Sequence, residues 1–166
     1  VVCRRQRQMC IRDRFGEYGI IEDSKGLSIP YNFFKGALKI PETPCEISKN
    51  SNSILFDFCN HLKQTKGLSD LDLILFEKHL KEGLYFDSSI PKGYGVGSSG
   101  ALVAAVYNKY SNNKITVLEN LTREKLLKLK TIFSKMESFF HGKSSGLDPL
   151  NSYLSIPILI LSLIHI

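Results

Sequence analysis

A glycine-rich loop is the first segment of this chain that could do chemistry. The sequence PKGYGVGSSG occupies residues 91–100 and precedes a strong helix former at 101–110. Glycines let backbone N–H groups approach an anion closely. A helix start presents free N–H groups and the positive end of its dipole to the same place, and Ser98 and Ser99 add hydroxyl groups there. The loop therefore predicts a cradle for phosphate, against the alternative of an ordinary glycine-rich turn capped by serine.

Two kinds of nucleotide-binding loop can be compared with this segment. A Walker A sequence is absent, whereas residues 95–100 match GxGxxG and Glu119 follows Gly100 by 19 residues, as in dinucleotide-binding proteins. However, residues 91–94 separate the preceding strand from the first glycine of that match, and a dinucleotide-binding strand normally runs almost straight into its glycine. A nucleotide-dependent oxidoreductase is therefore kept only as an outside alternative.

A second group of candidate residues lies between positions 137 and 148. Glu137 stands in the last turn of an expected helix, and Asp148 follows eleven residues later, after a loop of small residues. Carboxylates suit Mg²⁺ binding and base catalysis at a phosphoryl-transfer centre. Taken alone, such carboxylates are more often solvated surface groups, and His141 between them is more often a hydrogen-bonded structural histidine.

The elements that must position these residues follow from periodicity and turn signals. We expect helices at 53–66, from a Ser69–Asp70 cap to about Lys81, at 101–110, and from Thr122 to about Phe140. We expect strands at 84–90, in 156–166, and as two short strands in 27–40 around a turn at 32–36. Residues 41–53 and 141–149 are expected to be loops. A β-rich start followed by helices and two Gly/Ser loops indicates an α+β fold.

Length and charge narrow the class of protein. The chain has 166 residues, 43% hydrophobic and 23% charged, as in an ordinary soluble globular domain. Its net charge is +6, but residues 1–14 hold five arginines and one aspartate and carry +4 of it. The net charge of +2 on residues 15–166 does not indicate a nucleic-acid-binding surface. Because Arg123 is the only later arginine among 16 lysines, we interpret residues 1–14 as a foreign or disordered segment.

The remaining sequence signals concern location in the cell. The apolar run at 156–166 is shorter than the roughly 20 residues that span a bilayer, and residues 161–166 are interpreted as a second foreign end. No apolar run typical of a signal peptide precedes residue 15. The four cysteines form no CxxC pair, so a zinc site is not expected. Cys45 and Cys59 are expected to be reduced thiols of a cytoplasmic protein.

Three segments occur in the order of a known family's motifs. GEYGIIEDSKGLSIPY (16–31) is similar to its first motif, PKGYGVGSSGAL (91–102) to its ATP-phosphate loop, and ESFFHGKSSGLDP (137–149) to a segment with Glu eleven residues before Asp. Together they resemble the GHMP kinase superfamily, and mevalonate kinases most closely. The resemblance covers residues 15–160. It implies an α+β N-terminal domain with helices packed against a mixed β-sheet, truncated before a C-terminal domain.

The resemblance also implies roles for individual residues. Asp148 would be the catalytic carboxylate, and Glu17 and His141 would line the substrate side. Ser99 and Glu137 would ligate Mg²⁺. Small residues of the loop would hold the ATP phosphates: Gly93, Gly95, Gly97, Ser98 and Ser99.

Four positions depart from the mevalonate kinase pattern. Tyr18, Ser144 and Pro149 stand where His, Pro and Asn are usual, which leaves the acceptor alcohol open. Ile11 stands at the position of a lysine on the first strand of the family. Without that positive charge and without the C-terminal domain, we expect this chain alone to show little kinase turnover.

The function implied by the resemblance is ATP-dependent phosphorylation of the terminal hydroxyl of mevalonate, with ATP and Mg²⁺ as cofactors. The alternatives are another GHMP kinase acting on a sugar, phosphomevalonate or homoserine, and a non-catalytic binding protein with a kinase fold. We expect a small-molecule substrate and neither a nucleic acid nor a membrane as partner. A homodimer of the full-length protein stays open.

Overall fold

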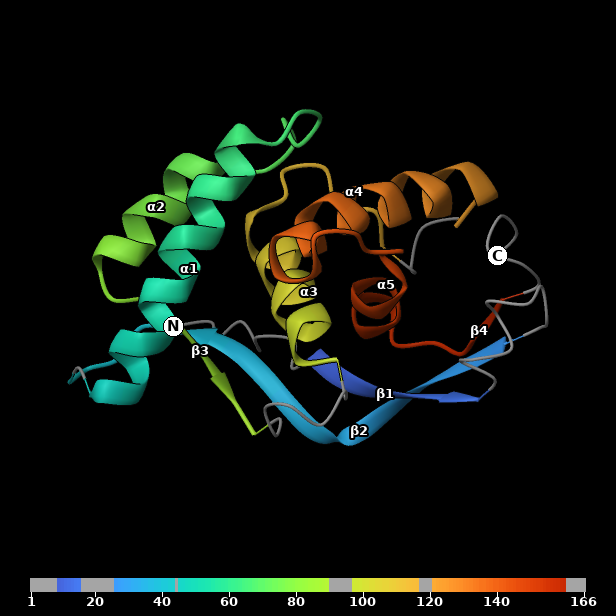
Figure 1. The fold of residues 1–166 in the computed structure, drawn as a ribbon, viewed down its shortest axis with the longest axis horizontal. Coiled ribbons are helices and arrows are strands. Elements are labelled where there is room, and N and C mark those ends of the chain that lie inside the picture. Colours follow the sequence, from blue (N-terminus) through green and yellow to red (C-terminus); the bar gives the residue numbers. More distant parts are fainter. Residues whose placement is uncertain (1–8, 16–25, 44, 90–96, 117–120, 161–166) are drawn as a thin grey trace, which may run out of the picture.

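The computed structural model describes residues 9–15, 26–43, 45–89, 97–116 and 121–160. In Figure 1 the described strands form one layer, and the helices lie over one face of it. This arrangement agrees with the expected α+β fold. The elements in chain order are β1 (Met9–Phe15), β2 (Gly26–Lys39), α1 (Glu46–Gln64), α2 (Leu73–Lys81), β3 (Tyr85–Ser88), α3 (Ser98–Tyr110), α4 (Arg123–His141), α5 (Leu147–Leu154) and β4 (Ile158–Ile160).

The long strand β2 is the centre of the sheet. Its first residues pair with β1 on one edge and β4 on the other, and its last residues pair with β3. Each of these pairings is antiparallel, so the described strands form an antiparallel sheet and not the expected mixed one. The expected turn at 32–36 is also wrong, because β2 continues through it. The turn residues leave an irregularity in the pairing with β1: Cys10 lies opposite Lys35 and Ile11 opposite Tyr31, so residues 32–34 form a bulge in β2.

The two ends of the described chain both enter this sheet. Residues 9–15 form β1, with Ile11 opposite Tyr31 of β2. Residues 9–14 are therefore part of the sheet and not a disordered arm, while their foreign origin stays a prediction and residues 1–8 lie outside the described residues. In β4, Ile158 is buried and Leu159 is 53% exposed, as expected for neighbouring residues on opposite faces of a strand.

Helix α3 is the central helix of the layer. Residues Gly100–Tyr107 are all buried, and most of them are small or β-branched. The ring of Tyr107 meets Phe133 of α4 and Tyr153 of α5 edge to face, each at a centroid distance of 5.1 Å. Such aromatic pairs stabilise beyond the area that they bury. The three helices that carry the candidate site are thus fixed to one another through one aromatic cluster.

Helix caps explain where the helices begin. Thr122 accepts a hydrogen bond from the Lys125 amide and starts α4, as expected. Helix α1 begins at Glu46, inside the expected loop at 41–53, because Cys45 and Ser48 form a capping box. Helix α2 is capped by Asp72 and not by Ser69–Asp70.

Helix α5 is an element that the sequence analysis missed. It begins at Leu147, within the expected loop at 141–149. Gly146 precedes it in the left-handed conformation, at φ 72° and ψ 7°. Every residue of α5 except Asp148 is buried, so tertiary packing stabilises this eight-residue helix.

Candidate active site

The first component of the site is the N-terminus of α3. Gly97 precedes the helix in the left-handed conformation, at φ 75° and ψ 33°, which glycine adopts without strain. The first intrahelical hydrogen bond runs from the Ala101 amide to the Gly97 carbonyl, at 3.0 Å. The amides of Ser98, Ser99 and Gly100 precede that bond, and the first turn holds no acidic side chain. This helix start therefore has the donors and the dipole that favour an anion.

The second component is Asp148, which lies against this helix start. A Cβ atom added to Gly97 would lie 3.9 Å from Asp148 Oδ2. A Cβ atom added to Gly100 would lie 2.8 Å from Asp148 Cβ and 3.0 Å from the Pro149 amide nitrogen. Gly100 thus permits the close approach of α5 to α3. The approach brings a partly exposed carboxylate to the edge of a potential phosphate site.

The last turns of α4 supply the third component. His141 Nε2 lies 3.0 Å from Ser99 Oγ, so the end of α4 contacts the start of α3. Glu137 lies one turn before His141 on the same face of α4. Its side chain is only 2% exposed, and Ser144 Oγ donates a hydrogen bond to Glu137 Oε2. A buried carboxylate is therefore held beside the loop that connects α4 to α5.

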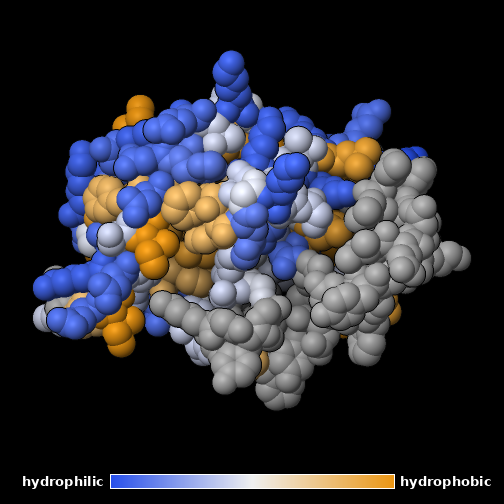
Figure 2. All heavy atoms as spheres, in the orientation of Figure 1, coloured by the Kyte–Doolittle hydropathy of each residue, from blue (hydrophilic) through white to orange (hydrophobic). Residues whose placement is uncertain are grey.

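An apolar cavity of about 400 Å³ opens beside Ser98 and Ser99. Figure 2 shows hydrophobic surface in the region of α1 and α3, where this cavity lies. Its volume falls in the range of small-molecule pockets, which are mostly apolar with a few polar groups. The apolar lining comes from α1, β3, α3 and α4 and consists of Ile47, Ile54, Tyr85, Phe86, Leu102 and Phe140.

A family model describes most of this structure. The model of the GHMP kinases N terminal domain matches residues 55–155, which run from α1 to the end of α5. The chain belongs to the GHMP kinase family. Comparison with curated proteins and with solved structures gives no match.

Membership of the GHMP kinases indicates a small-molecule kinase, and these enzymes use ATP, typically with Mg²⁺. The match does not select an acceptor alcohol within the family. It includes the described candidate residues of this GHMP kinase, namely Gly97, Ser98, Ser99, Glu137, His141 and Asp148. The positions of Glu17, Gly93, Gly95 and Glu119 lie outside the described residues.

The donor set can be tested against Mg²⁺. Within the described ranges, no group of three or more His, Cys, Asp or Glu side chains could hold a metal ion by itself. Mg²⁺ is usually bound through one or two carboxylates together with substrate phosphates, and not by an all-protein cage. The hydroxyl of Ser99 at the α3 N-terminus and the buried Glu137, one turn before the His141 that contacts Ser99, supply the kinds of donor that this mode uses.

The sequence does not predict a role for two residues of the candidate site, Gly100 and Ser144. Gly100 belongs to the glycine-rich loop motif, but its contact with α5 depends on a helix that no local signal predicts. Ser144 differs from the proline that is usual at its position in the mevalonate kinase pattern. The signal that could have identified it is a hydroxyl seven residues after a buried glutamate, but its use depends on the path of the loop.

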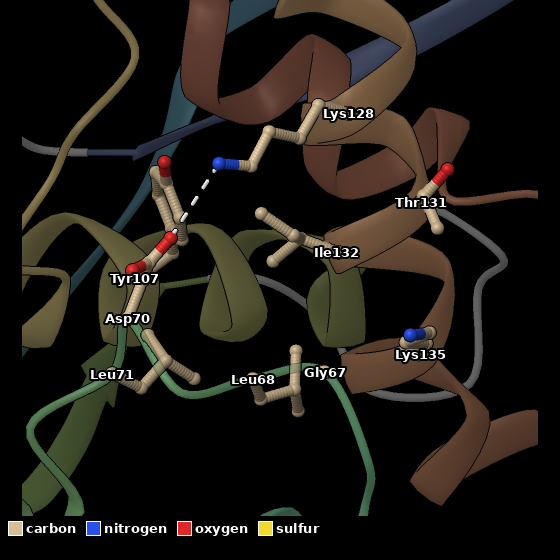
Figure 3. A pocket seen from close by; sticks show the side chains of 9 residues that line it. All are labelled: Gly67, Leu68, Asp70, Leu71, Tyr107, Lys128, Thr131, Ile132 and Lys135. Carbon is tan, nitrogen blue, oxygen red and sulfur yellow. Dashed lines mark ion pairs between the residues drawn. The ribbon is translucent and has the colours of Figure 1, made fainter.

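A smaller cavity of about 220 Å³ lies away from these residues (Figure 3). Leu68, Leu71 and Tyr107 contribute its apolar lining, and Lys128 of α4 reaches across it to Asp70, with a nitrogen–oxygen distance of 3.6 Å. None of the candidate site residues lines it.

Among the helices that the structure describes, none is long and apolar enough to cross a membrane.

Proposed function

We propose that this GHMP kinase transfers the γ-phosphoryl group of ATP to the terminal hydroxyl of mevalonate. The hydroxyl oxygen would form a bond to the γ-phosphorus as the bond to the bridging oxygen of ADP breaks. The hydroxyl proton would pass to Asp148. The observation that carries the proposal is the position of the Asp148 carboxylate against the N-terminus of α3, close to Gly97.

The helix start supplies the electrostatic part of the reaction. The amides of Ser98, Ser99 and Gly100 come before the first residue that donates an intrahelical hydrogen bond. Phosphate oxygens would accept hydrogen bonds from these amides. The interaction of a helix dipole with an anion contributes about 0.3–1 kcal/mol at exposed sites and up to about 2 kcal/mol when partly buried. Because these donors are already oriented, no reorganisation is needed as charge moves towards the ADP oxygen.

The apolar cavity beside Ser98 supports a site for the nucleoside part of ATP. It adjoins the proposed phosphate site and is bordered by aromatic side chains, including Phe140 at the end of α4. Ser99 and Glu137 are the residues that would hold Mg²⁺. When bound, the ion would neutralise charge on the β- and γ-phosphates. His141 would orient the Ser99 hydroxyl through their contact.

A single-turnover assay tests the proposal and remains sensitive if the chain reacts slowly. The chain is held in excess over [γ-³²P]ATP with Mg²⁺ and mevalonate, and labelled phosphomevalonate is separated. Asp148→Asn should reduce the transfer rate about 10²–10⁴-fold, as expected for loss of a general base. The matched control is Asp57→Asn, an exposed carboxylate on α1, which should leave the rate within about twofold.

Other acceptors in the same assay separate the alternatives. Transfer to a sugar, phosphomevalonate or homoserine, and not to mevalonate, would keep the kinase and change its substrate. ATP binding without transfer to any acceptor would favour a non-catalytic binding protein. Binding of NAD in preference to Mg-ATP, lost in Glu119→Ala, would contradict the kinase proposal altogether.

A further inference from the structure

Ser144 connects the two carboxylate-bearing elements of the site. Its hydroxyl donates to Glu137 Oε2 on α4 and accepts from the Gly146 amide at the start of α5, at 3.0 Å. Its backbone carbonyl accepts a hydrogen bond of 2.5 Å from Oγ of Ser134, a residue of α4. One residue in the connecting loop is thus tied to both helices.

We propose that Ser144 is a positioning residue that orients the Glu137 carboxylate for a divalent cation. The inference rests on the proposed function, in which Glu137 is a ligand of Mg²⁺. A hydroxyl has one hydrogen to donate. The hydrogen bond that Ser144 Oγ accepts from the Gly146 amide fixes the direction in which that hydrogen is donated. Since Glu137 is 2% exposed, the protein and not bulk water determines how the carboxylate is turned.

The same hydroxyl also fixes the start of α5. Gly146 is the residue that precedes the helix, and Asp148 lies in its first turn. A change at Ser144 would therefore act on the cation site through Glu137 and on Asp148 through Gly146. Proline, the usual residue at this position in the mevalonate kinase pattern, has no side-chain donor for the carboxylate. Serine gives this chain a contact with Glu137 that the pattern does not supply.

Three variants separate the contact with Glu137 from the support of α5. Ser144→Ala removes both hydrogen bonds of the hydroxyl, and Ser144→Thr retains a hydroxyl. Ser145→Ala is the matched control, because Ser145 Oγ accepts from the Leu147 amide at 3.4 Å and so supports the same helix start one residue later. Far-UV circular dichroism confirms that each variant folds, and Ser144→Thr keeps the proposal testable if Ser144→Ala does not.

The readout is cation binding and needs no turnover. Mn²⁺ is added to each chain in the presence of AMPPNP, a non-hydrolysable ATP analogue, and free Mn²⁺ is followed by electron paramagnetic resonance. Residues that orient a metal ligand typically change metal affinity 10–100-fold. We therefore expect Ser144→Ala to weaken Mn²⁺ binding at least about tenfold. Ser144→Thr should stay within about threefold of the wild-type chain, and Ser145→Ala within about twofold.

Two results would overturn the inference while leaving the kinase intact. One is wild-type Mn²⁺ affinity in Ser144→Ala, and the other is an equal loss in Ser144→Ala and Ser145→Ala, which would reduce Ser144 to support of α5. A wild-type chain that binds neither AMPPNP nor Mn²⁺ with it would overturn the proposed function, and the role of Ser144 with it.

Discussion

Gly146→Ala is the substitution that tests most sharply how α5 is held in place. Gly146 has φ 72°, and an added Cβ atom would contact the Lys130 carbonyl oxygen and lie 2.6 Å from the Ser134 amide nitrogen. Both are backbone atoms in the middle of α4, so neither can rotate away. The substitution must therefore move α5, with Asp148 in its first turn, away from α4.

The magnitude has two parts. A non-glycine residue in the left-handed conformation costs about 1–2 kcal/mol, and inserting an atom into packed surroundings typically costs about 1–3 kcal/mol. Gly83→Ala is the matched control, since Gly83 has φ 88° but its added Cβ atom would meet nothing closer than Pro41 Cδ at 3.7 Å. Gly83→Ala should carry the first cost alone. The predicted difference in the free energy of unfolding is therefore about 1–3 kcal/mol.

Urea unfolding followed by circular dichroism measures that difference, and the affinity for Mg-AMPPNP is measured on the same samples. We expect Gly146→Ala to be the less stable variant and to bind the nucleotide more weakly, while Gly83→Ala binds it like the wild-type chain. Equal unfolding free energies for the two variants, within about 0.5 kcal/mol, would refute the argument that α4 and α5 are in backbone contact at Gly146.

Two further predictions concern the pH dependence of stability. Hydrogen bonds from Lys63 and Lys81 lower the pKa of Glu77, so Glu77→Gln should reduce the urea midpoint at pH 7. The difference from wild type should shrink as the pH falls below 4.5, where the unfolded carboxyl becomes protonated. A difference that persists undiminished at pH 3 would contradict this prediction. Burial, followed by the charge of Lys109, lowers the pKa of His79, whose Nδ1 lies 2.9 Å from the Tyr110 hydroxyl. As the pH falls through 6.5, His79 therefore takes up a proton in the unfolded state before it does so in the folded state. The wild-type chain should lose stability in this range, and His79→Gln should lose less. Urea midpoints that fall in parallel for the two chains between pH 7.5 and 5 would contradict a lowered pKa of His79.

The sequence predicted the elements whose signals are local. Thr122 and the apolar face of α4 predicted that helix correctly, since a cap and a helical period are both read within a few turns. The helix after the glycine loop is confirmed as α3, and the strand at 84–90 as the shorter β3.

Elements that depend on distant partners were missed. Helix α5 has only eight residues and includes Pro149, so no local propensity predicts it, and burial against α3 and α4 forms it. The residues at 32–36 have the character of a turn, but the pairings of β2 before and after them continue the strand, and the turn signal remains only as a register shift opposite β1. In both cases tertiary contacts override the local preference.

The candidate site was predicted as a set of residues but not as a geometry. The motifs selected Ser99, Glu137, His141 and Asp148, and the structure brings His141 to Ser99 and Asp148 to Gly97. No local rule predicts such contacts, because they join positions 42 or more residues apart. The hydrogen bonds of Ser144 could not be predicted for the same reason, since they depend on how the loop after α4 turns back.

The most direct test of the central claim is a crystal structure of the chain with Mg²⁺ and AMPPNP. The account predicts that the β- and γ-phosphates accept hydrogen bonds from the amides of Ser98, Ser99 and Gly100, with the Asp148 carboxylate facing the γ-phosphate. Phosphates bound at any other place on the chain, or a γ-phosphate at α3 with Asp148 turned to the opposite side, would contradict it.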